Sequence, residues 1–241
     1  MRSGVAIFPG SNCDRDIIVA LKKITRKVPL KLWHKDTEIP NLDLIVLPGG
    51  FSFGDYLRCG ALAARSPIIR NIKDHVSRGG ALLGICNGFQ ILIETGILPG
   101  SLIRNKKLLF TCRETILEIQ KTIENPFTKG FKEGFNLKIP VAHNEGNYFA
   151  PAPLLNELDS EGRIAFKYVK GDNPDSNIDY NPNGSSNDIA GILSKNGRVL
   201  GMMPHPERAI NPLHGGSDGL KFLTKSIAVS YTHLRAHETS L

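Results

Sequence analysis

The sequence predicts an α/β fold built on a mostly parallel central sheet, with helices on both faces and extra antiparallel strands. In the first half, short apolar runs alternate with helical patterns, which implies right-handed crossovers and a parallel sheet. The run at residues 42–47 (LDLIVL) is apolar apart from Asp43, as in a strand buried on both faces. In the second half, strand-like runs follow one another with few helical intervals, which indicates antiparallel additions.

The elements of the first half follow in order from these patterns. A helix is expected over residues 14–27, capped by Asp14, because apolar residues recur there at helical spacing. Helical material is also expected from residue 56 to residue 76. The expected strands are residues 5–8, 30–33, 42–47 and 81–85.

The second half is predicted to hold six strands, one long loop and a last helix. Residues 171–187 are almost wholly turn formers and predict an exposed loop, and a helix is expected from Ser217 to about Ala228. We therefore expect one domain over residues 1–228, followed by a disordered or non-native tail over 229–241. The six expected strands are residues 108–112, 115–119, 137–141, 163–169, 188–193 and 199–203.

Composition narrows the classes of function. The chain has 241 residues, of which 41% are hydrophobic, and no apolar run approaches the ~18 residues of a membrane span. Its formal net charge of +7 is scattered, which favours a solvated surface facing an acidic partner protein or a phosphorylated metabolite over a nucleic-acid groove. The four cysteines form no CxxC pair, so neither a metal site nor a disulfide framework is expected. We expect a cytoplasmic protein that binds no nucleic acid and no membrane.

The run ALLGICNGFQILIE predicts a nucleophile elbow at Cys86. An apolar strand turns there into a helix, and Gly84 and Gly88 leave room beside the cysteine or supply backbone angles that only glycine adopts easily. A thiol at a helix N-terminus is favoured as the reactive thiolate. The alternative is a buried cysteine that acts as a small hydrophobe.

A cysteine nucleophile needs a base and a group that orients the base. In GMMPHPER, His205 and Glu207 are two residues apart, so an extended backbone would place both side chains on one side. His143, in PVAHNEG, is an alternative base. These residues favour a triad of Cys86, His205 and Glu207.

Attack on a carbonyl also needs preformed hydrogen-bond donors for the oxyanion. The backbone N–H of Asn87 follows the nucleophile and is one candidate. The second is expected from LPGGFSFGD, where Gly50 follows a strand and leaves the backbone open to a substrate. A plain Pro-Gly-Gly turn is the alternative.

The segments LPGG, GICNGFQ and MPHPE together resemble the class I glutamine amidotransferases, whose fold is flavodoxin-like. The longer motifs GSNCD, GGFSFGDYLRCGA, CNGFQ, NPNGS and MPHPER resemble the glutaminase subunit of phosphoribosylformylglycinamidine synthase, a purine-biosynthetic enzyme. The resemblance runs in order over about residues 4–228.

The resemblance implies a mechanism and partners. Cys86 would attack glutamine to give a thioester, His205 would transfer protons, and Glu207 would orient His205. Gln90 and His143 would hold the amino-acid end of the substrate. No P-loop is present, so the resemblance implies an ATP-dependent synthetase subunit and a small accessory subunit as partners, with ATP and magnesium bound by the synthetase and no cofactor in this chain.

Three other interpretations stay open at this point. The chain could be a flavodoxin-like cysteine hydrolase or chaperone, the glutaminase of another amidotransferase pathway, or a non-catalytic subunit in which Cys86 is idle. The His-x-Glu pair and the longer motifs argue against all three.

Overall fold

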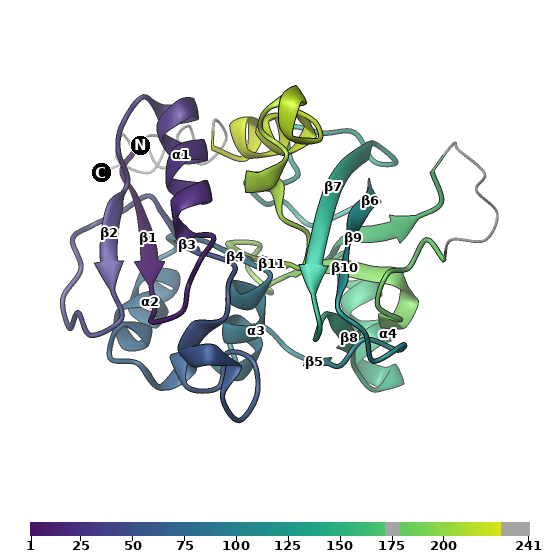
Figure 1. Ribbon diagram of the computed structural model, residues 1–241, viewed down its shortest axis with the longest axis horizontal. Helices are drawn as coiled ribbons and strands as arrows, with labels where there is room; N and C mark the ends of the chain where they lie inside the picture. The colour runs from purple at the N-terminus through teal and green to yellow at the C-terminus, as the bar shows by residue number, and fades with distance from the viewer. Residues whose placement is uncertain (172–178, 228–241) are drawn as a thin grey trace.

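The computed structural model describes residues 1–171 and 179–227 (Figure 1). A nine-stranded sheet in the order β2-β1-β3-β4-β11-β10-β9-β6-β7 runs through this part of the chain. Its parallel strands are β2 (Leu30–Trp33), β1 (Ser3–Ile7), β3 (Leu44–Leu47), β4 (Ala81–Ile85) and β11 (Val199–Met202). Its antiparallel strands are β10 (Ile189–Leu193), β9 (Ile164–Val169), β6 (Thr111–Ile119) and β7 (Asn136–His143). The predicted fold class is therefore confirmed.

Helices cover both faces of the parallel half. Helix α1 (Asp14–Thr25) leads from β1 to β2, whereas α2 (Ile68–Ser77) leads from β3 to β4 in the opposite direction along the sheet. Right-handed crossovers in opposite directions place the two helices on opposite faces. Helix α3 (Asn87–Glu94) follows β4 directly and packs against β3, β4 and β11.

The chain adds smaller elements that the sequence patterns did not predict. Strands β5 (Ser101–Ile103) and β8 (Asn147–Phe149) form a separate antiparallel pair, and α4 (Ala152–Ser160) precedes β9. Residues 218–227 are helical, as predicted. Phe222 of this helix is fully buried and meets Phe166 of β9 edge to face at 5.6 Å, so the helix closes the core beside the antiparallel strands.

Several expected boundaries were wrong. Residues 108–112 and 115–119 do not form two strands, because β6 is one strand from Thr111 to Ile119 that pairs along its length with β7. Residues 56–62 are not helical. Asp14 does not cap α1, since Cys13 is the N-cap and makes no capping side-chain hydrogen bond.

The expected tail at residues 229–241 lies outside the described residues, so the domain boundary at 228 stays a prediction. Within the described ranges, none of the helices has the length and apolarity needed to span a bilayer.

Candidate active site

Cys86 lies at the junction of β4 and α3 in a strained backbone conformation. Its φ of 49° and ψ of −104° lie outside the common regions for a residue with a side chain. The backbone is fixed on the strand side, because Cys86 N–H donates to the carbonyl of Met202 at 2.8 Å. The side chain is buried, and the thiol lies 3.7 Å from the carbonyl oxygen of Ala142. An elbow geometry is thus present at the predicted residue.

The two flanking glycines are required for space rather than for unusual angles. Neither has a positive φ, whereas Cys86 itself does. A Cβ on Gly88 would lie 2.0 Å from the carbonyl oxygen of Leu47, and one on Gly84 would lie 2.5 Å from Leu92 Cδ1. The glycines therefore let α3 approach β3 and β4 closely.

The sheet brings His205 to the same end as Cys86. Strand β11 lies parallel beside β4 with Met202 opposite Ile85, so the chain leaves both strands at one edge. His205 N–H then donates to the carbonyl of Pro140 at 2.8 Å, which anchors this segment to β7. The segment that carries the base is thus held between the elbow and the antiparallel half of the sheet.

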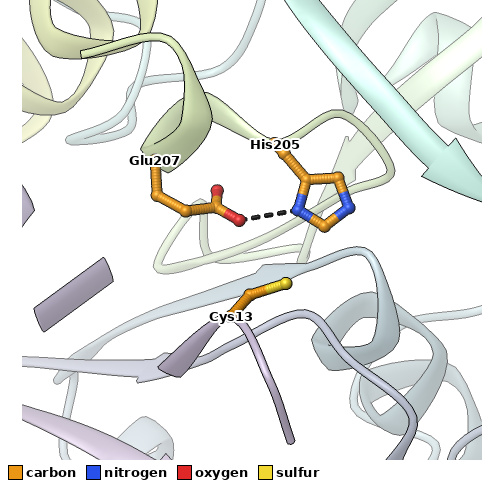
Figure 2. Close-up of side chains that lie close together, drawn as sticks. All are labelled: Cys13, His205 and Glu207. Atoms are coloured by element: carbon orange, nitrogen blue, oxygen red, sulfur yellow. Dashed lines mark hydrogen bonds and ion pairs between the residues drawn. The ribbon is translucent and has the colours of Figure 1, made fainter. Parts of the chain in front are cut away.

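Glu207 holds the imidazole of His205 from one side. Glu207 Oε1 lies 2.6 Å from His205 Nδ1, and both side chains are almost fully buried, at 1% and 2% exposure (Figure 2). The backbone reaches this geometry through a 3₁₀ turn (Pro206–Arg208), not through the extended segment expected from the sequence. The predicted contact between His205 and Glu207 is present, but the backbone between them forms a 3₁₀ turn instead of an extended segment.

The second ring nitrogen of His205 remains available. Among the described residues, Nε2 has no hydrogen-bond partner although it is buried. Burial opposes the charged imidazole, but the carboxylate of Glu207, with further contributions from Cys86 and Cys13, raises the pKa of His205 well above its usual value. The site therefore favours an imidazolium between a carboxylate and a thiol, the arrangement that a cysteine nucleophile requires.

Gly50 and Asn87 each present a backbone N–H at this edge of the sheet. Gly50 lies shortly after β3, has a φ of 138° and forms an isolated antiparallel β-bridge with Ser11. A Cβ at Gly50 would lie 2.7 Å from the backbone nitrogen of Asn12. Within the part of the chain that the structure describes, neither N–H donates to another group. Both donors are free to meet a substrate oxygen.

The side chain of Asn87 has a role that the sequence did not indicate. Its Oδ1 accepts from Ser52 N–H at 3.1 Å, and its Nδ2 donates to Gln90 Oε1 at 2.9 Å and to Asp55 Oδ1 at 3.3 Å. These bonds tie the GGFSFGD loop to the first turn of α3. The loop that carries Gly50 and the elbow that carries Cys86 are consequently fixed to each other.

Gln90 braces the site from within α3. Its Nε2 donates to the carbonyl of Glu145 at 2.6 Å, while its Oε1 accepts from Asn87. Both ends of the carboxamide are engaged within the chain, which favours a bracing role. Direct contact between Gln90 and a substrate stays a prediction.

His143 occupies a separate, neutral network. Its Nδ1 lies 3.1 Å from Asn105 Oδ1 and its Nε2 lies 3.5 Å from Asn183 Nδ2. Burial, with the charge of His205 adding to it, lowers the pKa of His143 to about 3. Because its partners are amides and its ring stays neutral, His143 is a weaker candidate for the base than His205.

The described end of the expected loop at residues 171–187 is not exposed throughout. Asn183 and Ser185 are buried, at 1% and 4% exposure. Asn183 Nδ2 donates to the carbonyl of Gly146 at 2.7 Å, and Ser185 Oγ accepts from Tyr148 N–H at 3.0 Å. Turn-forming residues here supply hydrogen bonds to a neighbouring segment, while residues 172–178 lie outside the described residues.

Sequence reasoning also missed Cys13 and Arg208. Arg208 donates to Cys13 Sγ at 2.9 Å, and Cys13 lies with its sulfur toward the ring edge of His205 that carries Nδ1 (Figure 2). The two residues are separated by 195 positions, so no local pattern connects them.

The fold and this site define a glutamine amidotransferase. A family profile described as a CobB/CobQ-like glutamine amidotransferase domain matches residues 1–216, and the chain belongs to this family. The phosphoribosylformylglycinamidine synthase subunit PurQ of Mesorhizobium japonicum is 50% identical over 95% of this chain and 100% of its own length. The protein of the same name from Roseobacter denitrificans is 52% identical over 91% of this chain and 94% of its own length.

Solved structures agree with these relatives. A chain from the structure of PurLQS from Thermotoga maritima matches with a TM-score of 0.80 and 39% identity, covering 97% of this chain and 98% of that one. A glutamine amidotransferase from Thermotoga maritima shares the fold at 17% identity, with a TM-score of 0.54 and coverage of 99% of this chain and 85% of that one.

Proposed function

We propose that the chain is the glutaminase subunit of phosphoribosylformylglycinamidine synthase, which hydrolyses L-glutamine and delivers ammonia to a synthetase subunit. The convergence of Cys86, His205 and Glu207 at one edge of the sheet carries this proposal. Relatives that bear this subunit name and match over nearly their whole length support the choice of pathway.

The geometry supports a two-stage reaction at the glutamine side-chain amide. Once the Cys86 thiol proton has passed to His205 Nε2, Cys86 Sγ attacks the amide carbon, and the oxyanion accepts hydrogen bonds from the N–H groups of Gly50 and Asn87. His205 returns the proton to the leaving nitrogen, which departs as ammonia and leaves a γ-glutamyl thioester on Cys86. Water then attacks the thioester with His205 as base, and glutamate and the free thiol are released.

Glu207 orients His205 and stabilises its charged form during both stages. The Nδ1 to Oε1 contact at 2.6 Å directs Nε2 toward the thiol, and the carboxylate balances the imidazolium in a buried site. We assign no cofactor to this chain, because thiol, imidazole and backbone donors suffice for amide hydrolysis.

The ammonia is consumed elsewhere in the proposed complex. An ATP-dependent synthetase subunit would bind ATP and magnesium and convert formylglycinamide ribonucleotide into formylglycinamidine ribonucleotide, with a small accessory subunit in the assembly. The match to a chain of the PurLQS structure from Thermotoga maritima supports such partners. We place the complex in the cytoplasm, a compartment that suits the four free thiols of this chain.

Labelling by a glutamine-analogue electrophile tests the nucleophile. The chain is mixed with diazo-oxo-norleucine, with and without its synthetase partner and ligands, and adducts are located by mass spectrometry. We expect one adduct on Cys86, loss of that adduct and of ammonia release in Cys86→Ser, and retention of both in Cys112→Ser, an exposed free cysteine. A Cys86 that stays unlabelled in the assembled complex would contradict the proposal.

A further inference from the structure

A second thiol lies beside the imidazole that the proposed mechanism uses. Cys13 Sγ, a ring nitrogen of His205 and a carboxylate oxygen of Glu207 all lie within 4.8 Å of one another, and all three residues are buried. Figure 2 shows Cys13 and Glu207 on different sides of the Nδ1 edge of the ring. The mechanism assigns no task to Cys13.

The protein backbone is shaped to permit this contact. A Cβ on Gly49 would lie 2.6 Å from His205 Cε1 and 3.3 Å from Cys13 Sγ, so only glycine fits where the LPGG turn passes the two side chains. Cys13 N–H also donates to the Gly49 carbonyl at 3.3 Å. The turn thus fixes Cys13 against the imidazole.

Arg208 supplies a positive charge next to the sulfur of Cys13. Its guanidinium donates to Cys13 Sγ at 2.9 Å, and it follows Glu207 directly in the chain. An imidazolium on His205 and this guanidinium would repel each other, and a hydrogen-bond acceptor that contacts both groups offsets part of that repulsion. The sulfur of Cys13 is in position to do so, because it contacts both side chains.

The charged and titratable neighbours of His205 come from five parts of the chain. Glu207 and Arg208 lie on the 3₁₀ turn, Asp16 lies on α1, and His143 lies on β7. The carboxylate of Glu207 balances an imidazolium, while Asp16, whose pKa is raised by burial and then by Glu207, interacts with Arg208. The remaining neighbours are the thiols of Cys86 and Cys13.

We propose that Cys13 is a positioning residue of the glutaminase site, whose sulfur accepts a hydrogen bond from the Arg208 guanidinium and lies against the His205 imidazole that Glu207 holds at Nδ1. This inference rests on the proposed function. In the reaction, Cys13 forms no covalent bond and its proton is not transferred. Its effect is to keep His205 oriented and to stabilise the imidazolium that donates a proton to the leaving ammonia.

The pH profile of kcat/KM separates this role from simple packing. The alkaline limb reports loss of the proton from the His205 imidazolium. A change that destabilises the imidazolium lowers the pKa of His205 and moves this limb to lower pH. In the complex with its synthetase partner, Cys13→Ala should lower the ratio of kcat/KM at pH 9 to that at pH 7 by about three- to tenfold, since one pKa unit is tenfold. Cys13→Ser keeps an acceptor and should stay within about twofold of wild type.

A second substitution tests the electrostatic cause. The double variant Cys13→Ala/Arg208→Gln also lacks the cation, so it should recover part of the ratio of kcat/KM at pH 9 to that at pH 7 that Cys13→Ala loses. Arg208→Gln alone should leave the alkaline limb of the kcat/KM profile in place or move it to higher pH. Cys112→Ala serves as the control, because Cys112 is exposed. Equal losses of kcat/KM at both pH values in Cys13→Ala, or a limb that falls in Arg208→Gln, would overturn the proposal.

Imidazole NMR of His205 in the chain alone gives a readout that does not depend on glutaminase activity. His205→Asn identifies the signal, and its titration should move to lower pH in Cys13→Ala but not in Cys13→Ser. A complex that releases no ammonia from glutamine refutes the proposed function, whereas an unchanged His205 titration in Cys13→Ala refutes the role of Cys13. If Cys13→Ala does not fold, a His205 titration that moves to lower pH in Arg208→Gln or in Cys13→Ser still overturns the proposal.

Discussion

Replacing Glu207 by Gln should slow glutamine hydrolysis by about 10- to 150-fold. The contact between Glu207 Oε1 and His205 Nδ1 is 2.6 Å long and almost fully buried, so it has the geometry of a strong charge-assisted hydrogen bond. Hydrogen bonds to charged groups contribute about 1.5–3 kcal/mol, and each ~1.4 kcal/mol corresponds to a factor of ten in rate. Glutamine has the same shape and keeps an acceptor for Nδ1, but it cannot balance the imidazolium.

Ammonia release by the complex with its synthetase partner measures this effect. Circular dichroism and urea unfolding confirm that the variant is folded, and Glu133→Gln, at an exposed position, controls for the loss of one negative charge. We expect the loss mainly in kcat, since Glu207 acts through His205 and does not contact glutamine. A variant with wild-type kcat would remove Glu207 from the mechanism.

Three other predictions follow from the same structure. In urea unfolding, Gly88→Ala should lower the free energy of unfolding by several kcal/mol, because its Cβ would lie 2.0 Å from the carbonyl oxygen of Leu47. The control Gly96→Ala has open space around its Cβ and a φ of +72°, so it should lower the free energy of unfolding by only about 1–2 kcal/mol. The pKa of His143 is about 3 in the fold and near 6.5 in the unfolded chain, so stability should fall as pH drops through this window, by up to about 1.4 kcal/mol per pH unit. His143→Gln should flatten that dependence in urea unfolding between pH 7 and pH 4, and an unaltered slope would assign it to other groups. Tyr56 and Leu57 are 71% and 79% exposed, and they follow the loop that Asn87 binds. Replacing both residues by Ser should weaken binding to the synthetase subunit at least fivefold in a binding titration. An unchanged affinity would place the interface elsewhere.

Local patterns predicted the elements that carry the nucleophile and the base. An apolar strand before Cys86 and a helical pattern after it specify the elbow without reference to the rest of the chain. His205 and Glu207 are two residues apart, so their pairing is also a local property. In each case the residues that determine the geometry are neighbours in the sequence.

Contacts between distant segments could not be predicted in the same way. The contact between Cys13 and Arg208 joins the loop after β1 to the 3₁₀ turn Pro206–Arg208, and no periodicity connects residues 195 positions apart. Asn183 and Ser185 have the composition of an exposed turn, but their side chains satisfy backbone groups of Gly146 and Tyr148, which makes them buried. The sequence predicted solvated residues here because the segment that covers them is not adjacent in the chain.

The continuous strand β6 shows a related difficulty. Arg113 and Glu114 interrupt the apolar pattern, so the sequence predicted two short strands. In the structure, both residues pair with β7, opposite Val141 and Pro140. Backbone pairing along the hairpin maintains the strand where side-chain polarity alone indicates a break.

The position of β11 in the sheet has a consequence for synthesis of the protein. This strand, residues 199–202, lies between β4 and β10 and joins the parallel half to the antiparallel half, although the ribosome makes it after every other strand of the sheet. A nascent chain that does not yet include β11 has two unjoined half-sheets and lacks the imidazole. Glutamine hydrolysis is thereby withheld until residues 199–207 have been made, so a nascent chain that ends before β11 cannot release ammonia from glutamine.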